Sequence, residues 1–141
     1  MDAAEARDRF SAARVARLAT ADFSGQPHLV AICFAVDGET LYTAVDQKPK
    51  TTISLRRLKN LAMNSRCSIL VDHYEDDKWD RLWWVRADGA GRALRAGETE
   101  HAQALELLLE RYEQYRRDAP AGPVIAVDVE RWVGWAASGG S

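Results

Sequence analysis

The sequence predicts a mainly β fold with peripheral helices, in which about six antiparallel strands form a barrel. Segments with strand-like patterning outnumber helical ones, and the helical segments are inserted between them. Asp37-Gly38 is a strong hairpin signal between two strands, and it leaves no room for the crossover of about a dozen residues that parallel strands need. The expected order is one helix, three strands, a helix, two strands, a helix and a final strand.

The first part of the chain predicts a short helix and a three-stranded meander. Residues 2–13 place small and aromatic side chains on one helical face, and residues 14–20 alternate as a strand does. Pro27 opens the next strand. Residues 28–36 are apolar almost without interruption, so we expect both faces of this strand to be buried. Residues 41–45 complete the hairpin.

The second part predicts two further helices and three strands. A helix with an apolar stripe begins at Thr51 or Thr52, either of which could cap it. Residues 82–94 form a long strand, in which Gly89 and Gly91 indicate a bulge or a bend. The remaining predicted elements are a strand over 67–74, a helix over 99–117 and a strand over 124–135.

Length and charge set the class of protein. The chain of 141 residues fits one domain over residues 1–141, with 136–141 as a flexible tail. A formal net charge of −2 argues against a nucleic-acid partner. No apolar run reaches the roughly 20 residues that span a bilayer, which argues against a membrane protein. The acidic start, Met1–Glu5, lacks the plan of a signal peptide, so we expect a cytoplasmic protein.

The segment 46–59 concentrates positive charge in a slightly acidic protein. Its cations stand against a single acid, Asp46, and two of them lie near a helix start, where the helix dipole disfavours cations unless an anion is bound. The free N–H groups of the first helical turn would complete a phosphate site. The alternative is a solvated helix face. The cations are Lys48, Lys50, Arg56, Arg57 and Lys59, and the phosphate cradle would be Lys50, Thr51 and Thr52.

Three tryptophans, Trp79, Trp83 and Trp84, lie close together near Tyr74. Flat aromatic side chains near a barrel mouth can form the wall of a site for a planar substrate, or anchor a subunit interface, and core packing is the alternative. Trp83 and Trp84 are consecutive in one strand, so they point to opposite faces. One of the two should therefore lie at a dimer interface or at a ligand.

One titratable residue is a candidate for acid chemistry. His73 follows Asp72 at the end of a strand, which makes it a candidate proton donor. The other histidines, His28 and His101, lie on different elements without metal-ligand spacing, so we expect no metal site. No nucleophile elbow or Gly-rich phosphate loop is present.

Four segments resemble the pyridoxamine 5′-phosphate oxidase-like FMN-binding split-barrel superfamily, and most closely its actinobacterial F420-dependent branch. They are Arg17-Leu18-Ala19-Thr20, Gly25-Gln26-Pro27-His28, Arg57-Leu58-Lys59-Asn60-Leu61 and Arg66-Cys67-Ser68-Ile69-Leu70-Val71-Asp72. The stretch from Leu70 to Arg86 is also similar to probable F420-dependent oxidoreductases. This resemblance covers nearly the whole chain.

The resemblance implies a six-stranded Greek-key split barrel that forms a homodimer, with two cofactor sites at the subunit interface. It places Arg57 where the family has a phosphate-binding Lys or Arg, with Arg56 before it and with Pro27 and His28 nearby. Lys48, Lys50 and Thr51 lie in a long connection that could reach the acidic tail of F420. Two positions depart from the family: Ala31 replaces an arginine of the FMN oxidases, and Ser65 replaces a proline.

The function implied is that of an F420-dependent oxidoreductase that transfers hydride between the deazaflavin and a small conjugated acceptor. The phosphodiester and glutamates of F420 suit the basic segment 46–59 better than FMN does, and the missing arginine at Ala31 weakens the case for FMN. Trp83 or Trp84 would form the substrate wall. The alternatives are an FMN-dependent enzyme of the pyridoxamine-phosphate oxidase type and a non-catalytic protein that binds flavin, deazaflavin or haem.

Overall fold

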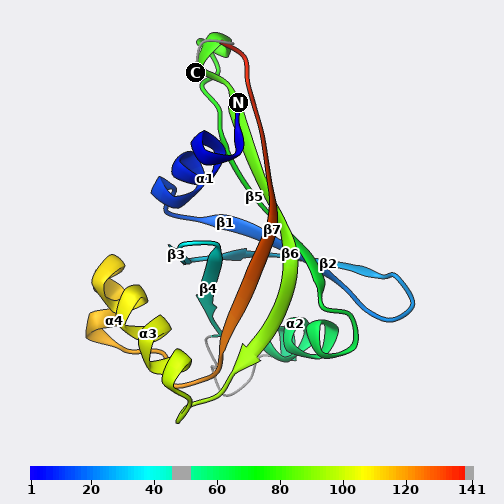
Figure 1. The fold of residues 1–141 in the computed structure, drawn as a ribbon, viewed down its shortest axis with the longest axis vertical. Coiled ribbons are helices and arrows are strands. Elements are labelled where there is room, and N and C mark those ends of the chain that lie inside the picture. Colours follow the sequence, from blue (N-terminus) through cyan, green and yellow to red (C-terminus); the bar gives the residue numbers. More distant parts are fainter. Residues whose placement is uncertain (46–51, 139–141) are drawn as a thin grey trace.

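The computed structural model describes residues 1–45 and 52–138. A single antiparallel sheet, in the order β2-β1-β5-β6-β7-β4-β3, curls into a split barrel with helices around it (Figure 1). The mainly β architecture with peripheral helices is therefore confirmed. The strands are β1 (Ala16–Ala21), β2 (Pro27–Ile32), β3 (Ala35–Asp37), β4 (Thr40–Ala44), β5 (Arg66–His73), β6 (Trp83–Leu94) and β7 (Val124–Ala136).

The sheet has seven strands, and the prediction of six was wrong because residues 28–36 form two strands. The chain bends at Phe34, whose backbone N–H donates to the Tyr112 hydroxyl at 3.1 Å, while that hydroxyl lies 2.9 Å from the Phe34 carbonyl oxygen. The side chain of a residue far away in the sequence thus replaces the ladder partners that a continuous strand would need. β2 and β3 are the two edges of the sheet, and this bend joins them.

β2 is not buried on both faces as predicted. Its residues alternate between exposed and half-buried until Ile32, which is buried. An edge strand has a neighbour on one side only, and the apolar composition of this strand therefore leaves apolar side chains in solvent. Leu29, with 68% of its surface exposed, is the clearest case.

Two helices cover the inside of the barrel. α1 (Ala3–Ala12) is capped by Asp2, whose carboxylate accepts from the Glu5 N–H at 2.8 Å, and it buries Ala6 and Phe10. α2 (Thr52–Met63) packs on β1 and β6. Phe10 lies against Phe34 and Trp132, with ring centroids 5.1 and 5.3 Å apart, in the larger core cluster.

The predicted helix over 99–117 is interrupted. α3 (Thr99–Arg111) and α4 (Glu113–Arg117) are separated by Tyr112, whose backbone is extended. Tyr112 is buried, and its hydroxyl serves the bend at Phe34, so tertiary contact overrides helix propensity here. α3 forms a second core cluster against β4 and β7.

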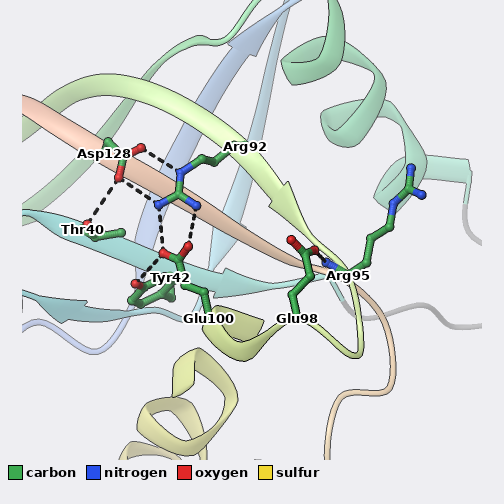
Figure 2. A network of polar contacts seen from close by, with 7 residues as sticks. All are labelled: Thr40, Tyr42, Arg92, Arg95, Glu98, Glu100 and Asp128. Atoms are coloured by element: carbon green, nitrogen blue, oxygen red, sulfur yellow. Dashed lines mark hydrogen bonds and ion pairs between the residues drawn. The ribbon is translucent and has the colours of Figure 1, made fainter. Parts of the chain in front are cut away.

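An ionic network fastens α3 to the sheet (Figure 2). The Arg92 guanidinium of β6 donates to Glu100 of α3 at 2.6 and 2.8 Å, and to Asp128 of β7 at 2.8 and 3.1 Å. Tyr42 of β4 donates to the same Glu100 at 2.8 Å. Burial, followed by the bond to Glu100 and its charge, raises the pKa of Tyr42 to about 12, so the phenol stays protonated as a donor. Elements far apart in sequence are thereby joined through one guanidinium.

The bulge predicted near Gly89 and Gly91 is present. The register of β6 with β7 shifts between Asp88, which faces Arg131, and Gly89, which faces Val129, so Glu130 is the extra residue. The sequence alternation of β7 places Arg131 on the same face as Val129, and the bulge reverses that placement from Glu130 onward.

The end of the chain is more ordered than predicted. β7 runs to Ala136, the Ala137 N–H donates to the Leu82 carbonyl at 2.8 Å, and the Ser138 hydroxyl donates to the Asp80 carbonyl at 2.5 Å. Residues 136–138 of the predicted flexible tail are therefore held by the strand and by these hydrogen bonds. Residues 139–141 lie outside the described residues. In Figure 1 the ends of β5, β6 and β7 project as a narrow arm with the short helix η1 (Trp79–Arg81) at its tip. None of the described helices is long and apolar enough to cross a membrane.

Candidate functional site

A groove of about 660 Å³ lies on the outer face of the sheet, across β2, β1, β5, β6 and β7. Large apolar side chains line it, among them Leu29, Leu70, Trp84 and Trp135, which are all partly or largely exposed. Exposed apolar side chains that gather in one place mark a ligand or partner surface more often than a solvated one. This groove is the first part of the candidate site.

Strand alternation explains most of the lining of the groove. In β1, Leu18 is buried inside the barrel, while its neighbour Ala19 lines the groove. Trp84 faces Trp135 across the β6–β7 ladder, which places the two indoles on the same face. The bulge at Glu130 is what turns Trp135 outward. The sequence analysis missed Trp135 because the phase of β7 depends on that bulge.

The predicted tryptophans take three different positions. Trp84 belongs to the outer face, whereas Trp83 packs against the core at the edge of the groove, so the two do point to opposite faces. Trp83 is also covered by the His73 ring, stacked at 6.1 Å between centroids, and by the Arg9 guanidinium at 5.5 Å. Trp79 lies on η1, is 64% exposed, and is not part of the groove.

His73 stands at the rim of the groove with an acidic partner that the sequence analysis did not identify. Its Nε2 lies 2.7 Å from an oxygen of Glu75, and the other oxygen of that carboxylate lies 3.5 Å from Arg81. The bond to His73 is the largest influence that lowers the pKa of Glu75, so the carboxylate stays charged. The arrangement fixes the His73 ring beside the groove, with Nε2 against a charged carboxylate.

Some of the cations predicted to form an anion site lie together at α2. Arg57 is buried beneath the helix, and Asn60, one turn on, donates to Thr20 of β1 at 3.0 Å. His28 of β2 lies within the field of Arg56 and Arg57. Its buried Nδ1 has no hydrogen-bond partner among the described residues. This is a positive corner that suits an anion.

Several predicted members of the anion site are not seen or lie elsewhere. Lys48, Lys50 and Thr51 are outside the described residues, and so is the side chain of Thr52. Lys59 lies on the outer side of α2, where it lines a separate pocket together with Arg56. Pro27 is exposed and borders a polar hollow beside the groove.

The groove and the basic corner lie on opposite faces of the β1–β2 ladder. His28 is paired with the inward-facing Thr20, whereas Leu29 is paired with Ala19, which lines the groove. Directly paired residues share a face, and consecutive residues do not. Within one chain the two candidate regions are therefore separated by the edge strand β2.

The state of His28 gives a prediction about pH. Burial first, then the charges of Arg56 and Arg57, lower the pKa of His28 from its ordinary 6.5. The unfolded chain then binds this proton more readily than the folded one, so the free energy of unfolding falls as the pH drops below about 6.5. Urea unfolding at about pH 7.5 and about pH 5.5 should show a smaller acid loss for His28→Gln than for the wild type. An equal loss in both proteins would contradict this assignment.

No three His, Cys, Asp or Glu side chains come together as a metal site within residues 1–45 and 52–138. The family model for pyridoxamine 5′-phosphate oxidase matches residues 3–136. A comparison with curated proteins found no match to the chain.

Solved structures resemble the fold at low sequence identity. A FAD-binding protein from Mesorhizobium loti superposes with a TM-score of 0.74 at 21% identity, covering 95% of this chain and 94% of that one. A conserved hypothetical protein of Mycobacterium tuberculosis gives 0.72 at 24% identity, covering 97% and 86%. The haem storage protein HutZ of Vibrio cholerae gives 0.72 at 16% identity, covering 96% and 95%. At these identities the structural likeness shows the fold alone.

Proposed function

Because this chain belongs to the pyridoxamine 5′-phosphate oxidase family, we propose that it is an oxidoreductase that binds the deazaflavin F420 and acts on a small conjugated acceptor. The observation that carries the proposal is the positive corner at α2, where the buried Nδ1 of His28 has no partner among the described residues and lies near Arg56 and Arg57. These groups fit an anionic phosphate. When bound, the deazaflavin supplies the hydride.

Charge favours F420 over FMN at this corner. Arg56 and Lys59 make no ion pair with any acid among the described residues. Two further cations, Lys48 and Lys50, precede them in the sequence. FMN carries one phosphate, whereas F420 carries a phosphodiester and several carboxylates. A larger surplus of cations matches the more highly charged cofactor.

The groove supplies the other requirements of the proposed reaction. Trp84 and Trp135 offer flat apolar surface on which a conjugated acceptor can lie. His73, held by Glu75 through Nε2, would give a proton through the remaining ring nitrogen to the acceptor that receives the hydride. The acceptor thus gains one hydride and one proton, and the protein contributes orientation and proton transfer.

A second copy of the chain would join the two regions. The outer face of one chain exposes Leu29, Leu70 and Trp135, which is apolar surface of the kind that homodimers bury. In a two-fold dimer the groove of one chain faces the partner, so a cofactor could touch the basic corner of one chain and the tryptophans of the other. We expect a homodimer through this face.

The dimer can be tested by one charge. Leu29→Glu should give a single chain in sedimentation velocity where the wild type gives two, because a carboxylate would be buried without a partner. Ala102→Glu adds the same charge to an exposed position of α3, outside the groove, and should remain dimeric. A wild-type monomer at about 50 μM, or a dimeric Leu29→Glu, would contradict the proposed interface.

A non-catalytic carrier of flavin, deazaflavin or haem is the second candidate. It is favoured by the ion pairs that occupy most charged side chains of the groove: Arg17 lies 3.4 Å from Asp72, and Arg86 lies 2.8 Å from Asp88. His73 alone would then be available for proton transfer. An FMN-dependent oxidase is the alternative within the enzyme class.

Fluorescence polarisation with the purified protein tests the proposal directly. F420 and FMN are titrated separately, and F420 should bind more tightly. Tight binding of FMN without binding of F420 would refute the choice of cofactor. Reduced F420 is then offered quinones, tetrapyrroles and unsaturated lactones, and oxidation by one of them supports an enzyme. Oxidation by none of them would favour the carrier.

A further inference from the structure

A second pocket lies beside α2, and two of its residues, Arg56 and Lys59, also belong to the cations of the proposed cofactor site. Its volume is about 640 Å³, and it is bounded by the β1–β2 turn on one side and by α2 on the other. Phe23 projects from the turn with 84% of its surface exposed, and Met63 from the helix with 71%. We refer to this site as the hairpin pocket.

The helix presents a cationic end and an apolar end to the hairpin pocket. Arg56, Lys59 and Met63 are spaced three and four residues apart, so they share one helical face. Arg56 and Lys59 are not paired with any acid that the structure describes. A ligand that spans this face would meet charge at one end and apolar surface at the other.

The turn opposite holds Phe23 in a defined position. The Asp22 carboxylate accepts from the Ser24 N–H at 2.9 Å, from the Ser24 hydroxyl at 2.7 Å and from the Gln26 N–H at 2.9 Å. Gly25 adopts φ +90°, and its N–H donates to the Asp22 carbonyl at 3.0 Å. The backbone that carries the exposed phenyl ring is therefore already ordered, so the turn loses little conformational freedom when the ring binds a ligand.

The charge balance selects the sign of the ligand. Among the residues that the structure describes, Asp22 is the one acid that lines the pocket. Its bonds within the turn lower its pKa, the largest contribution coming from the Ser24 hydroxyl. Two cations line the pocket against it, and Arg57 and Arg56 also depress the pKa of the nearby His28. A positive field favours an anion.

We propose that the hairpin pocket binds a small planar aromatic acid, with the ring against Phe23 and Met63 and the acid group between Arg56 and Lys59. Ring contacts with Phe23 and the sulfur of Met63 would supply affinity, and the two cations would supply selectivity for the acid. The site is separate from the groove, with which it shares no residue. Because Arg56 and Lys59 are shared with the proposed cofactor site, a bound F420 tail would compete with the ligand for these two cations.

The test uses 2-naphthoate as the probe, with neutral 2-naphthamide and non-aromatic cyclohexanecarboxylate as matched compounds. In isothermal titration calorimetry the naphthoate should bind at least about tenfold more tightly than either compound. Phe23→Ser and Lys59→Gln, both changes of exposed side chains, should each weaken naphthoate about tenfold, whereas Lys78→Gln on the distant 75–80 loop should leave it unchanged. Amide shifts of labelled protein should locate the probe at residues 22–25 and 59–63.

Four results would overturn the proposal. They are no binding of naphthoate at about 5 mM, equal binding of the naphthamide, amide shifts confined to the Trp84 and Trp135 groove, and loss of a subunit in Phe23→Ser by sedimentation. The last would make this face a contact between chains. A failure of cofactor binding leaves the naphthoate result unaffected, so the two proposals are tested apart.

Discussion

Gly89→Ala should be among the most destabilising single changes in this protein, lowering the free energy of unfolding by about 3 kcal/mol or more. A Cβ at Gly89 would overlap the carbonyl oxygen of Asp128 and lie 3.0 Å from the Cα of Val129. Both obstacles are backbone atoms of β7 at the centre of the longest strand pair, so they cannot rotate away. The midpoint and slope of urea unfolding measure the effect.

Gly91→Ala is the matched control, two residues along the same strand. There the added Cβ would meet the Leu61 side chain, with Cδ2 at 2.8 Å, and a flexible side-chain end can move. We expect a loss of about 1 kcal/mol or less. Equal losses in the two variants would show that the close approach at Gly89 is not what the bulge requires.

The bulge at Gly89 was predictable from the sequence, but its position on β7 was not. The pair Gly89 and Gly91 was sufficient to predict a bulge, because glycine inside a strand often marks one. The sequence could not place the extra residue on β7 at Glu130, since this depends on the pairing of two distant strands. A shift of the register by one residue moves every later side chain to the other face of the sheet. Trp135 lines the groove for that reason.

The prediction of one continuous strand over 28–36 was wrong for a related reason. The residues are apolar and suit a strand, and no turn residue breaks the run. The partner that stabilises the bend is the hydroxyl of Tyr112, 78 positions away in the sequence. The same contact interrupts the predicted helix over 99–117. Local periodicity predicts the element types, whereas these two boundaries depend on the long-range hydrogen bonds of one hydroxyl.

The grouping of cations around α2 was predictable from the local composition. A concentration of cations in a slightly acidic chain pointed to residues around α2, and His28, Arg56 and Arg57 do lie together. The aromatic cluster was only partly correct, because Trp79 lies at the tip of the arm and Trp83 is covered by His73 and Arg9. The partner of His73 was missed, although Glu75 stands two residues away, since a loop conformation sets that contact.

Arg57→Ala should weaken F420 binding by at least about tenfold, and Lys50→Ala by a smaller factor, if the basic corner holds the phosphate and the acidic tail. Lys78→Ala removes the same charge from the 75–80 loop and should leave affinity unchanged. Since Arg57 is buried, its variant is first compared with the wild type in urea unfolding. Lys50→Ala then provides a second reading that does not depend on a buried residue.

Salt separates a phosphate site from a solvated helix face. If cations of 46–59 contact the anionic cofactor, the dissociation constant of the wild type rises steeply between about 50 and about 300 mM salt, because screening weakens every such contact. Each variant has lost one contact and should show a shallower dependence. Unchanged affinity and unchanged slope in both variants would mean that these cations face solvent. The case for F420 over FMN would then lose its main physical support, while the family and the fold would stand.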